Sequence, residues 1–415
     1  MKFDTVIIGG GLSGLAAGVE LACGRQRVAI VSSGQSCMHF ISGSLELAGY
    51  GPDGRLVANP MDAVASMPPQ HPYTLMGRDL VGQHAERVAT LFDEAGIKTK
   101  GSHLRNHWRI SPVGVLKPAW LTLEDYATVD NPAKIPWKDV CIVNLRGFLD
   151  FFPDFLAAGL ERLGVDCRIK TVSAPAIECR RESTTGMRAT NIARVLHGTT
   201  VDELAAEINR VAGGVDMVLF PAVAGFNNFR ASRRLKEEVS RPMRYIATMG
   251  TSVPGVRAQI MLERHFSALG GTFMLGDTVV RGIFSGSRLR AVETINFKED
   301  LLEADNFIFA AGSFFSHGLT ATPEKVLEPV LGLDVCAPGG RQEWFDKDLF
   351  ARQPYISFGI AISGDTFRAM RQGATLDNVF VAGSALAGCD PIREGSGAGI
   401  ATTTALHVAS KILNS

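Results

Sequence analysis

The feature that most constrains the fold is a glycine pattern near the N-terminus. The apolar run Phe3–Ile8 leads into Gly9-x-Gly11-x-x-Gly14, and an apolar helical run follows. In a dinucleotide-binding unit the first glycine permits a tight turn, the second lets a phosphate approach the backbone, and the third lets the helix pack on the strand. Helix N-termini also attract phosphate through free N–H groups and the helix dipole. With a second strand over 27–32, the pattern predicts an N-terminal Rossmann-type βαβ unit.

A second set of strand-and-glycine elements stands near the C-terminus. An apolar strand over 306–312 ends at Gly312, and another over 378–383 ends at Gly383. The turn Gly395–Gly399 then opens a helix that runs to about residue 413. A simple nicotinamide-binding domain does not need this return of the chain. Flavin domains of the glutathione-reductase-like type use it to place a helix N-terminus near the N1–C2=O edge of the ring, where the helix dipole stabilises the anionic reduced form. The paired motifs therefore predict a flavin-binding domain.

The end of the second strand bears on which flavin is bound. Ribose-binding versions of the motif carry Asp or Glu about 20 residues after the glycines, whereas this chain has Ser32, Ser33 and Gly34 at that place. The absence of a carboxylate favours FMN over FAD. The alternative is that Ser32 or Ser33 holds the adenosine ribose less strongly, in which case the cofactor is FAD.

The loop 35–44 follows the second strand and is expected to cross the cofactor, where Ser42, Gly43 and Ser44 can donate to a phosphate or ribityl chain. We consider His39 as a proton shuttle or flavin attachment site and Arg393 as a partner for an anionic substrate or hydroquinone. The plain alternatives are a hydrogen-bonded loop histidine and a surface arginine. The residues expected to bind the cofactor are Gly9, Gly10, Gly11, Leu12, Ser13, Gly14, Ser32, Ser33, Ser42, Gly43, Ser44, Gly312, Gly383, Ser384, Gly395, Gly397, Ala398 and Gly399.

The middle of the chain carries a second alternation of strand-like and helix-like runs, which predicts an inserted α/β domain for substrate or a partner. The expected fold class is thus α/β, a Rossmann-type flavin-binding domain with an inserted α/β domain. The strand-like runs are 139–145, 165–172 and 215–223, and the helix-like runs are 152–164 and 201–213. The expected division is 1–50, 251–315 and 366–415 for the flavin domain, and 51–250 with 316–365 for the inserted domain.

Composition excludes several classes of protein. Lys plus Arg and Asp plus Glu both number 42, so nothing indicates a nucleic-acid partner. No apolar stretch approaches the roughly 20 residues that a membrane-spanning helix needs, and any membrane association is expected to be peripheral. The seven cysteines are scattered, without the spacing of a zinc or iron–sulfur site, so we expect no metal and a reducing cytoplasm.

The chain resembles the B subunit family of anaerobic glycerol-3-phosphate dehydrogenase along nearly its whole length. The runs at 34–47 and 310–335 are far more specific than the glycine fingerprint. The matching segments are FDTVIIGGGLSGL at 3–15, GQSCMHFISGSLEL at 34–47, HPY at 71–73, NIARVL at 191–196, AAGSFFSHGL at 310–319, EPVLGLDV at 328–335 and AGSALAGCDPI at 382–392.

The resemblance implies a subunit of a quinone-linked complex that oxidises sn-glycerol 3-phosphate to dihydroxyacetone phosphate. In that family an A subunit carries FAD and the substrate site, the B subunit is associated with FMN, and an iron–sulfur C subunit ties the complex to the inner face of the cytoplasmic membrane. Three other interpretations remain open at this point. The chain could relay electrons without a substrate site, act alone as an FAD-dependent oxidoreductase resembling fumarate reductases, or be a scaffold without a cofactor.

Overall fold

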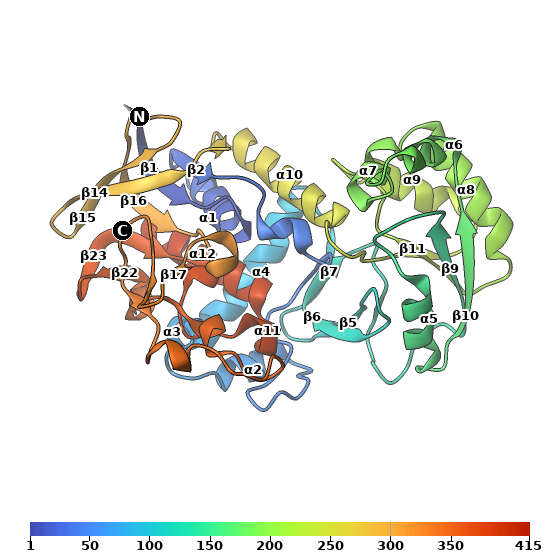
Figure 1. The fold of residues 1–415 in the computed structure, drawn as a ribbon, viewed down its shortest axis with the longest axis horizontal. Helices are drawn as coiled ribbons and strands as arrows, with labels where there is room; N and C mark the ends of the chain where they lie inside the picture. The colour runs from blue at the N-terminus through green and yellow to red at the C-terminus, as the bar shows by residue number, and fades with distance from the viewer. Residues whose placement is uncertain (299) are drawn as a thin grey trace. The chain divides into compact units, whose positions relative to one another are not determined.

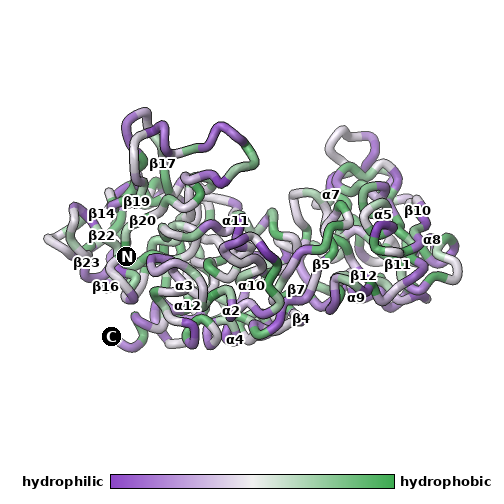
Figure 2. The backbone as a smooth tube through the Cα atoms, turned by 90° about the horizontal axis from the view of Figure 1, so that it is seen from below, coloured by the Kyte–Doolittle hydropathy of each residue, from purple (hydrophilic) through white to green (hydrophobic). Residues whose placement is uncertain are grey.

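The computed structural model describes residues 1–298 and 300–415, which form two compact units (Figure 1). Unit 1 comprises Met1–Cys37, Glu46–Gly96 and Leu262–Ser415, and unit 2 comprises Met38–Leu45 and Ile97–Met261. In unit 1 the first and last parts of the chain lie together, as the blue and red elements of Figure 1 show. Hydrophobic and hydrophilic stretches alternate along the chain in both units (Figure 2).

The core of unit 1 is a sheet with five parallel strands. In spatial order these are β13 (Thr272–Leu275), β2 (Val28–Ser32), β1 (Lys2–Ile8), β16 (Leu302–Phe309) and β23 (Ala374–Val381). Numbered along the chain, their order is 3-2-1-4-5, which is the order of dinucleotide-binding folds. All of β2 and the last four residues of β1 are buried, as expected of a parallel sheet covered on both faces. The predicted Rossmann-type fold class is confirmed.

Antiparallel strands extend this sheet. The strands β22 (Arg368–Arg371) and β21 (Ile362–Ser363) continue it beyond β23. The hairpin of β14 (Val279–Ser285) and β15 (Arg288–Thr294) joins it through β16. The turn of this hairpin contains Gly286 with a positive φ of 61°, a conformation that glycine adopts readily.

Helices cover the sheet of unit 1. The buried helix α12 (Gly397–Leu413) packs against α1 (Leu12–Cys23) and α4 (Arg78–Glu94). Two shorter helices, α2 (Pro60–Ala65) and α3 (Pro72–Met76), precede α4 and contact it. The predicted C-terminal helix is confirmed. No helix in the described parts of the chain is long and apolar enough to span a bilayer.

Unit 2 contains the second α/β pattern. Its parallel sheet has the order β10 (Asp166–Val172), β9 (Asp139–Leu145), β11 (Met217–Pro221) and β12 (Met243–Ile246). The accompanying helices are α5 (Pro153–Glu161), α6 (Pro175–Glu178), α7 (Ala189–Val195), α8 (Thr199–Ala212) and α9 (Arg230–Glu238). Two small antiparallel sheets complete the unit, one of β3 (Ser44–Leu45), β7 (Leu121–Leu123) and β4 (Thr99–Gly101), the other of β6 (Leu116–Ala119), β5 (His107–Ile110) and β8 (Thr128–Val129).

The compact units divide the chain differently from the domains expected from sequence. Residues 51–96 and 316–365, expected in the inserted domain, share unit 1 with the parallel sheet. The reason is long-range packing, because α3 and α4 contact α12. The helix α10 (Val253–Ala268) crosses the boundary between the units along the chain. The assignment of a substrate or partner role to 51–250 and 316–365 stays a prediction.

A pair of histidines between α4 and α12 predicts acid sensitivity. His84 and His407 lie edge to face with ring centroids 5.7 Å apart. Burial, aided by repulsion from His407, lowers the pKa of His84 to about 4, below the roughly 6.5 of an unfolded chain. Between these values the unfolded chain binds more protons, so stability falls as the pH falls from about 6.5 to about 4. We expect denaturant titrations to show a smaller loss of unfolding free energy over this window in His84→Phe than in the wild type. Parallel curves for the two proteins would contradict this.

Candidate functional site

The candidate site in unit 1 lies at the carboxyl ends of β1, β16 and β23, which are neighbours in the parallel sheet. Ligands of open α/β sheets bind at this edge, next to the point where the strand order reverses. Each of the three strands is followed closely by a glycine with positive φ: Gly9 (117°), Gly312 (81°) and Gly383 (74°). The sequence motifs at opposite ends of the chain therefore meet at one edge.

The N-terminal glycines have distinct roles in this geometry. A Cβ on Gly9 would lie 2.3 Å from the carbonyl oxygen of Ala310, and one on Gly14 would lie 1.9 Å from the carbonyl oxygen of Gly9. A Cβ on Gly11 would meet only Ser36, at 3.8 Å, so the space over this turn is open. Gly11 is also the N-cap of α1, and no side chain caps that helix. The turn thus combines free space with an uncapped helix N-terminus, as an anion site requires.

Of the two later glycines, Gly383 packs against this turn and Gly312 packs near Ser384. A Cβ on Gly383 would lie 2.1 Å from Oγ of Ser13, at the start of α1. The backbone N–H of Gly383 donates to Oγ1 of Thr404 in α12, at 2.9 Å. A Cβ on Gly312 would approach Oγ of Ser384 to 3.4 Å, and the side chain of Ser384 is exposed. Contacts with side-chain hydroxyls therefore place Gly383 next to Ser13 and Gly312 next to Ser384.

The second helix N-terminus belongs to α12. It begins at Gly397 after the N-cap Ser396, with no side-chain cap and no acidic residue in its first turn. The backbone N–H of Gly399 donates to the carbonyl oxygen of Glu46 at 2.8 Å. A Cβ on Gly399 would lie 2.3 Å from the hydroxyl oxygen of Tyr73. The predicted turn of Gly395, Gly397, Ala398 and Gly399 is thus held against the segment that follows the cofactor loop.

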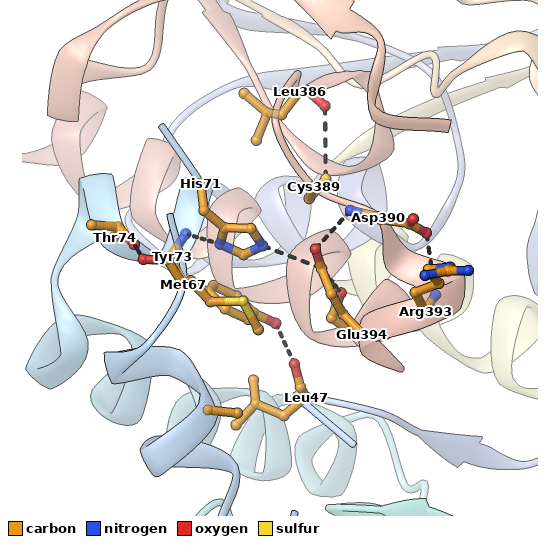
Figure 3. A network of polar contacts seen from close by, with 12 residues as sticks. Leu47, Met67, His71, Tyr73, Thr74, Leu386, Cys389, Asp390, Arg393 and Glu394 are labelled. Carbon is orange, nitrogen blue, oxygen red and sulfur yellow. Dashed lines mark hydrogen bonds and ion pairs between the residues drawn. The ribbon is translucent and has the colours of Figure 1, made fainter. Parts of the chain in front are cut away.

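A buried polar network fixes this turn (Figure 3). His71 is fully buried, and its Nδ1 accepts from the backbone N–H of Tyr73 at 3.1 Å. In a neutral imidazole Nε2 therefore carries the hydrogen, and it donates to Oε2 of Glu394 at 3.2 Å. Tyr73 donates through its hydroxyl to the carbonyl oxygen of Leu47 at 2.8 Å. The HPY segment at 71–73, which sequence reasoning noted only for its family resemblance, thus supports the C-terminal glycine turn.

Glu394 is the acceptor at the centre of this network. Its Oε1 accepts from the backbone N–H of Asp390 and its Oε2 from the hydroxyl of Ser396, both at 2.8 Å. Burial acts to raise the pKa of Glu394, but the hydrogen bonds from His71, the Asp390 backbone and Ser396 outweigh it and hold the pKa below its usual value. Burial also raises the pKa of the neighbouring Cys389 thiol, which keeps it protonated. Glu394 is therefore an anion beside the turn, and its negative charge is stabilised by hydrogen bonds from neighbouring residues.

At the end of β2 the structure adds a carboxylate that sequence reasoning missed. Ser32 is buried and donates to the carbonyl oxygen of Gly34 at 3.1 Å, while Ser33 is exposed. The backbone N–H of Asp277, just past the neighbouring strand β13, donates to the carbonyl oxygen of Ser32 at 3.2 Å. Oδ1 of Asp277 accepts two backbone N–H groups, whereas its buried Oδ2 has no partner among the described residues. The spatial order of the strands could have revealed this carboxylate, because it makes β13 the neighbour of β2 and so places the ends of these two strands side by side.

The remaining predicted residues of the cofactor loop lie in unit 2. His39 belongs to a short 3-10 turn, Cys37–Phe40, and its buried Nδ1 has no partner in the described part of the chain. Burial lowers the pKa of His39, which favours the neutral ring. The hydroxyl of Ser44 accepts from Oγ1 of Thr122 at 2.9 Å, within a buried chain that continues to His107. Ser44 is therefore engaged inside unit 2.

The loop residues before Ser44 are less confined. Ser42 is partly exposed, and Gly43 has a positive φ of 83° and lies against the ring of Tyr126. Arg393, the other residue considered for catalysis, belongs to unit 1. It is exposed on the short helix α11 (Pro391–Glu394), and its backbone N–H donates to Asp390. His39 and Arg393 belong to different units, and a catalytic role for each stays a prediction.

Known proteins place the chain in a family. The profile of the FAD binding domain family matches residues 4–400. The B subunit of anaerobic glycerol-3-phosphate dehydrogenase from Yersinia enterocolitica is 38% identical over 419 residues, which cover 100% of this chain and 99% of the relative. The corresponding protein from Pectobacterium atrosepticum is 37% identical over 417 residues, again with 100% and 99% covered.

Among solved structures, a 3-ketosteroid-Δ4-(5α)-dehydrogenase from Rhodococcus jostii RHA1 aligns over 99% of this chain and 97% of its own. The sequence identity is 9% and the TM-score 0.41, a likeness too slight to bear on function. The sequence relatives match end to end at more than a third identity, as the motifs at 34–47 and 310–335 predict. The chain therefore belongs to the FAD-binding domain family and, within it, to the family of anaerobic glycerol-3-phosphate dehydrogenase B subunits.

Proposed function

We propose that this chain is a flavin-binding subunit of a complex that oxidises sn-glycerol 3-phosphate to dihydroxyacetone phosphate and passes the electrons to quinone. The observation that carries the proposal is the meeting of two uncapped helix N-termini, those of α1 and α12, with three strand-end glycines at one sheet edge. The names of the relatives supply the substrate and the term subunit. A scaffold that had lost its cofactor would have no need to keep the open space over Gly11.

Within this proposal the flavin phosphates lie over Gly9–Gly14 and the ring lies near Gly395–Gly399. The bound flavin supplies hydride acceptance from the substrate carbon. The residues of the chain itself would stabilise charge on the flavin and hold it in position. The N–H groups of α1 face phosphate, and the N-terminus of α12 offers partial positive charge to the ring edge where negative charge develops on reduction. The His71–Glu394 hydrogen bond holds the turn that presents α12.

We propose FAD rather than FMN as the cofactor. The preference for FMN rested on the missing carboxylate at 32–34, and it finds no support in the family, whose profile describes an FAD binding domain. The fold also supplies an acidic group at this place, because Asp277 follows the strand next to β2. A buried carboxylate oxygen without a donor is costly to leave unpaired, and a ribose hydroxyl is a suitable donor.

The partners proposed here are an FAD-containing A subunit and an iron–sulfur C subunit that holds the complex peripherally on the inner face of the cytoplasmic membrane. The relatives' designation as B subunits favours assembly with other chains. In the described parts of this chain no group of three or more His, Cys, Asp or Glu side chains could hold a metal ion. Iron–sulfur electron transfer would then be the task of another protein of the complex.

Gly11→Val tests the phosphate site. The φ of Gly11 is −79°, a value open to any residue, so the obstacle to a side chain is the loss of free space and not backbone strain. We expect the variant to fold and the flavin content per chain after purification to fall at least tenfold. Gly214→Val is the matched control, because Gly214 also has open space around it but lies in unit 2. Full flavin occupancy in Gly11→Val would remove this turn from the cofactor site.

Asp277→Asn tests the choice of FAD. Asparagine keeps the Oδ1 that accepts the backbone N–H groups of Thr278 and Asn296 and removes only the charge. We expect the affinity for FAD to fall about tenfold and that for FMN, which lacks the adenosine, to stay unchanged in reconstitution titrations. Asp305→Asn, an exposed change on β16, is the control. An equal loss for both flavins would indicate a structural role, and released flavin with the mass of FMN would overturn the proposal.

The assignment to a complex is tested by assembly. Oxidation of glycerol 3-phosphate with an artificial dye as acceptor is measured for this chain alone and with the A and C subunits, at matched flavin content. We expect at least tenfold higher turnover in the assembled complex, because the proposed substrate site and electron path are shared among chains. Equal turnover would identify an autonomous flavoenzyme, the alternative that the fold alone also permits.

A further inference from the structure

A second candidate site lies in unit 1, within the segment 314–358. It is a cavity of about 280 Å³ lined by nine residues, most of them apolar. Small-molecule sites begin at about 300 Å³, so the cavity has room for a fused ring system and not for a dinucleotide. None of its lining residues belongs to the glycine turns described above.

Aromatic rings form the walls of the cavity. Trp344 and Phe358 lie edge to face with centroids 6.4 Å apart, and both are at least nine-tenths buried. Phe314 and Tyr355 form a second edge-to-face pair at 6.3 Å, nearer the surface. Rings arranged in this way favour a flat occupant, which can stack on one face and meet the edge of another.

Two hydrogen-bond donors of the lining residues lack acceptors. The Nε1 of Trp344 is buried and has no hydrogen-bond partner in the described part of the chain. Arg341 is exposed and its guanidinium forms no ion pair or hydrogen bond with any described residue, so both water and a ligand in the cavity can reach it. A buried N–H without an acceptor costs free energy. The occupant of such a cavity is therefore expected to bring an oxygen acceptor on the edge of an otherwise apolar ring.

The surroundings of the cavity connect it to an apolar surface and to the strand ends. The segment that supplies Phe345 to the lining continues to Leu349 and Phe350, which are 79% and 90% exposed. Phe314 follows Gly312 by two residues. A Cβ on Gly359, next to Phe358, would lie 2.3 Å from the backbone nitrogen of Ala387, just beyond the predicted Ser384. The cavity thus adjoins the sheet edge proposed for the flavin.

We propose that this cavity binds a planar, uncharged quinoid ring, with a ring carbonyl accepting from Arg341. An anionic ligand such as a phosphate ester is disfavoured, because the walls are largely apolar and Arg341 is the single charged residue among those that line the cavity. The inference deepens the proposed function by giving its electron acceptor a place on this chain. It rests on that function for the identity of the ring, but its test does not depend on flavin.

The test is binding of 1,4-naphthoquinone to the full chain, measured by calorimetry, with naphthalene as the probe that lacks oxygen acceptors. Ala321→Phe fills the cavity from an exposed lining position on the short strand β17 (Thr320–Ala321). Arg341→Met removes the guanidinium donors and keeps the stem. Arg290→Met, an exposed change on β15 away from the cavity lining, is the control.

We expect saturable binding of naphthoquinone, at least tenfold weaker in Ala321→Phe and three- to tenfold weaker in Arg341→Met. Arg290→Met should bind as the wild type does, and Arg341→Met should leave naphthalene binding unchanged. Flavin content, measured in the same samples, should not differ among the variants, which separates this test from that of the flavin site. Equal naphthoquinone affinity in wild type and Ala321→Phe, or naphthalene binding as tight as naphthoquinone, would overturn the proposal.

Discussion

Backbone contact at glycine is the constraint on which the rest of unit 1 depends. Where Gly14 crosses Gly9 and where Gly383 meets Ser13, a single added carbon would lie within about 2 Å of another atom. These contacts seat α1 on the end of β1 and bring the end of β23 against the start of α1. At Gly14 the approach is made by the backbone of Gly9, so no rearrangement of side chains can restore it after substitution, whereas at Gly383 the neighbour is the side chain of Ser13. The position of the candidate site is thus decided by the absence of side chains.

The local pattern of apolar and polar residues was enough to predict those strands whose structure follows directly from it. The strands β1, β9 and β11 are largely apolar runs with glycine or proline near their ends, and their type and bounds, like those of the more polar β10, agree closely with expectation. The segment 52–72 is a part of the fold that local pattern does not predict. Its prolines and polar residues suggest a connection to another domain, yet it contains α2 and the start of α3, whose neighbours α4 and α12 lie far away in sequence. No local period encodes that packing.

The candidate site shows the same division. The glycines were predictable, because the motif around each one indicates either a positive φ or a close backbone contact that only glycine permits. The supporting polar residues were not, since their meaning arises from distant partners. His71 looks like an ordinary residue before proline until Glu394 is placed against it. Asp277 looks like a turn residue until β13 is placed beside β2. Knowing that strand order in advance would have directed attention to the residue after β13, in place of Ser32 and Ser33 alone.

The charge of Glu394 has a further consequence for the helix that follows it. A carboxylate placed on the helix axis would partly neutralise the positive end of α12. Here its two oxygens are occupied by His71, the Asp390 backbone and the Ser396 hydroxyl, and its lowered pKa keeps it ionised across the neutral range. The first turn of α12 itself contains no acidic residue and no side-chain cap. The anion therefore orders the turn without capping α12. The N–H of Gly399 donates to Glu46, but no side chain caps the helix end, and that separation of tasks is what an anion-stabilising helix end requires.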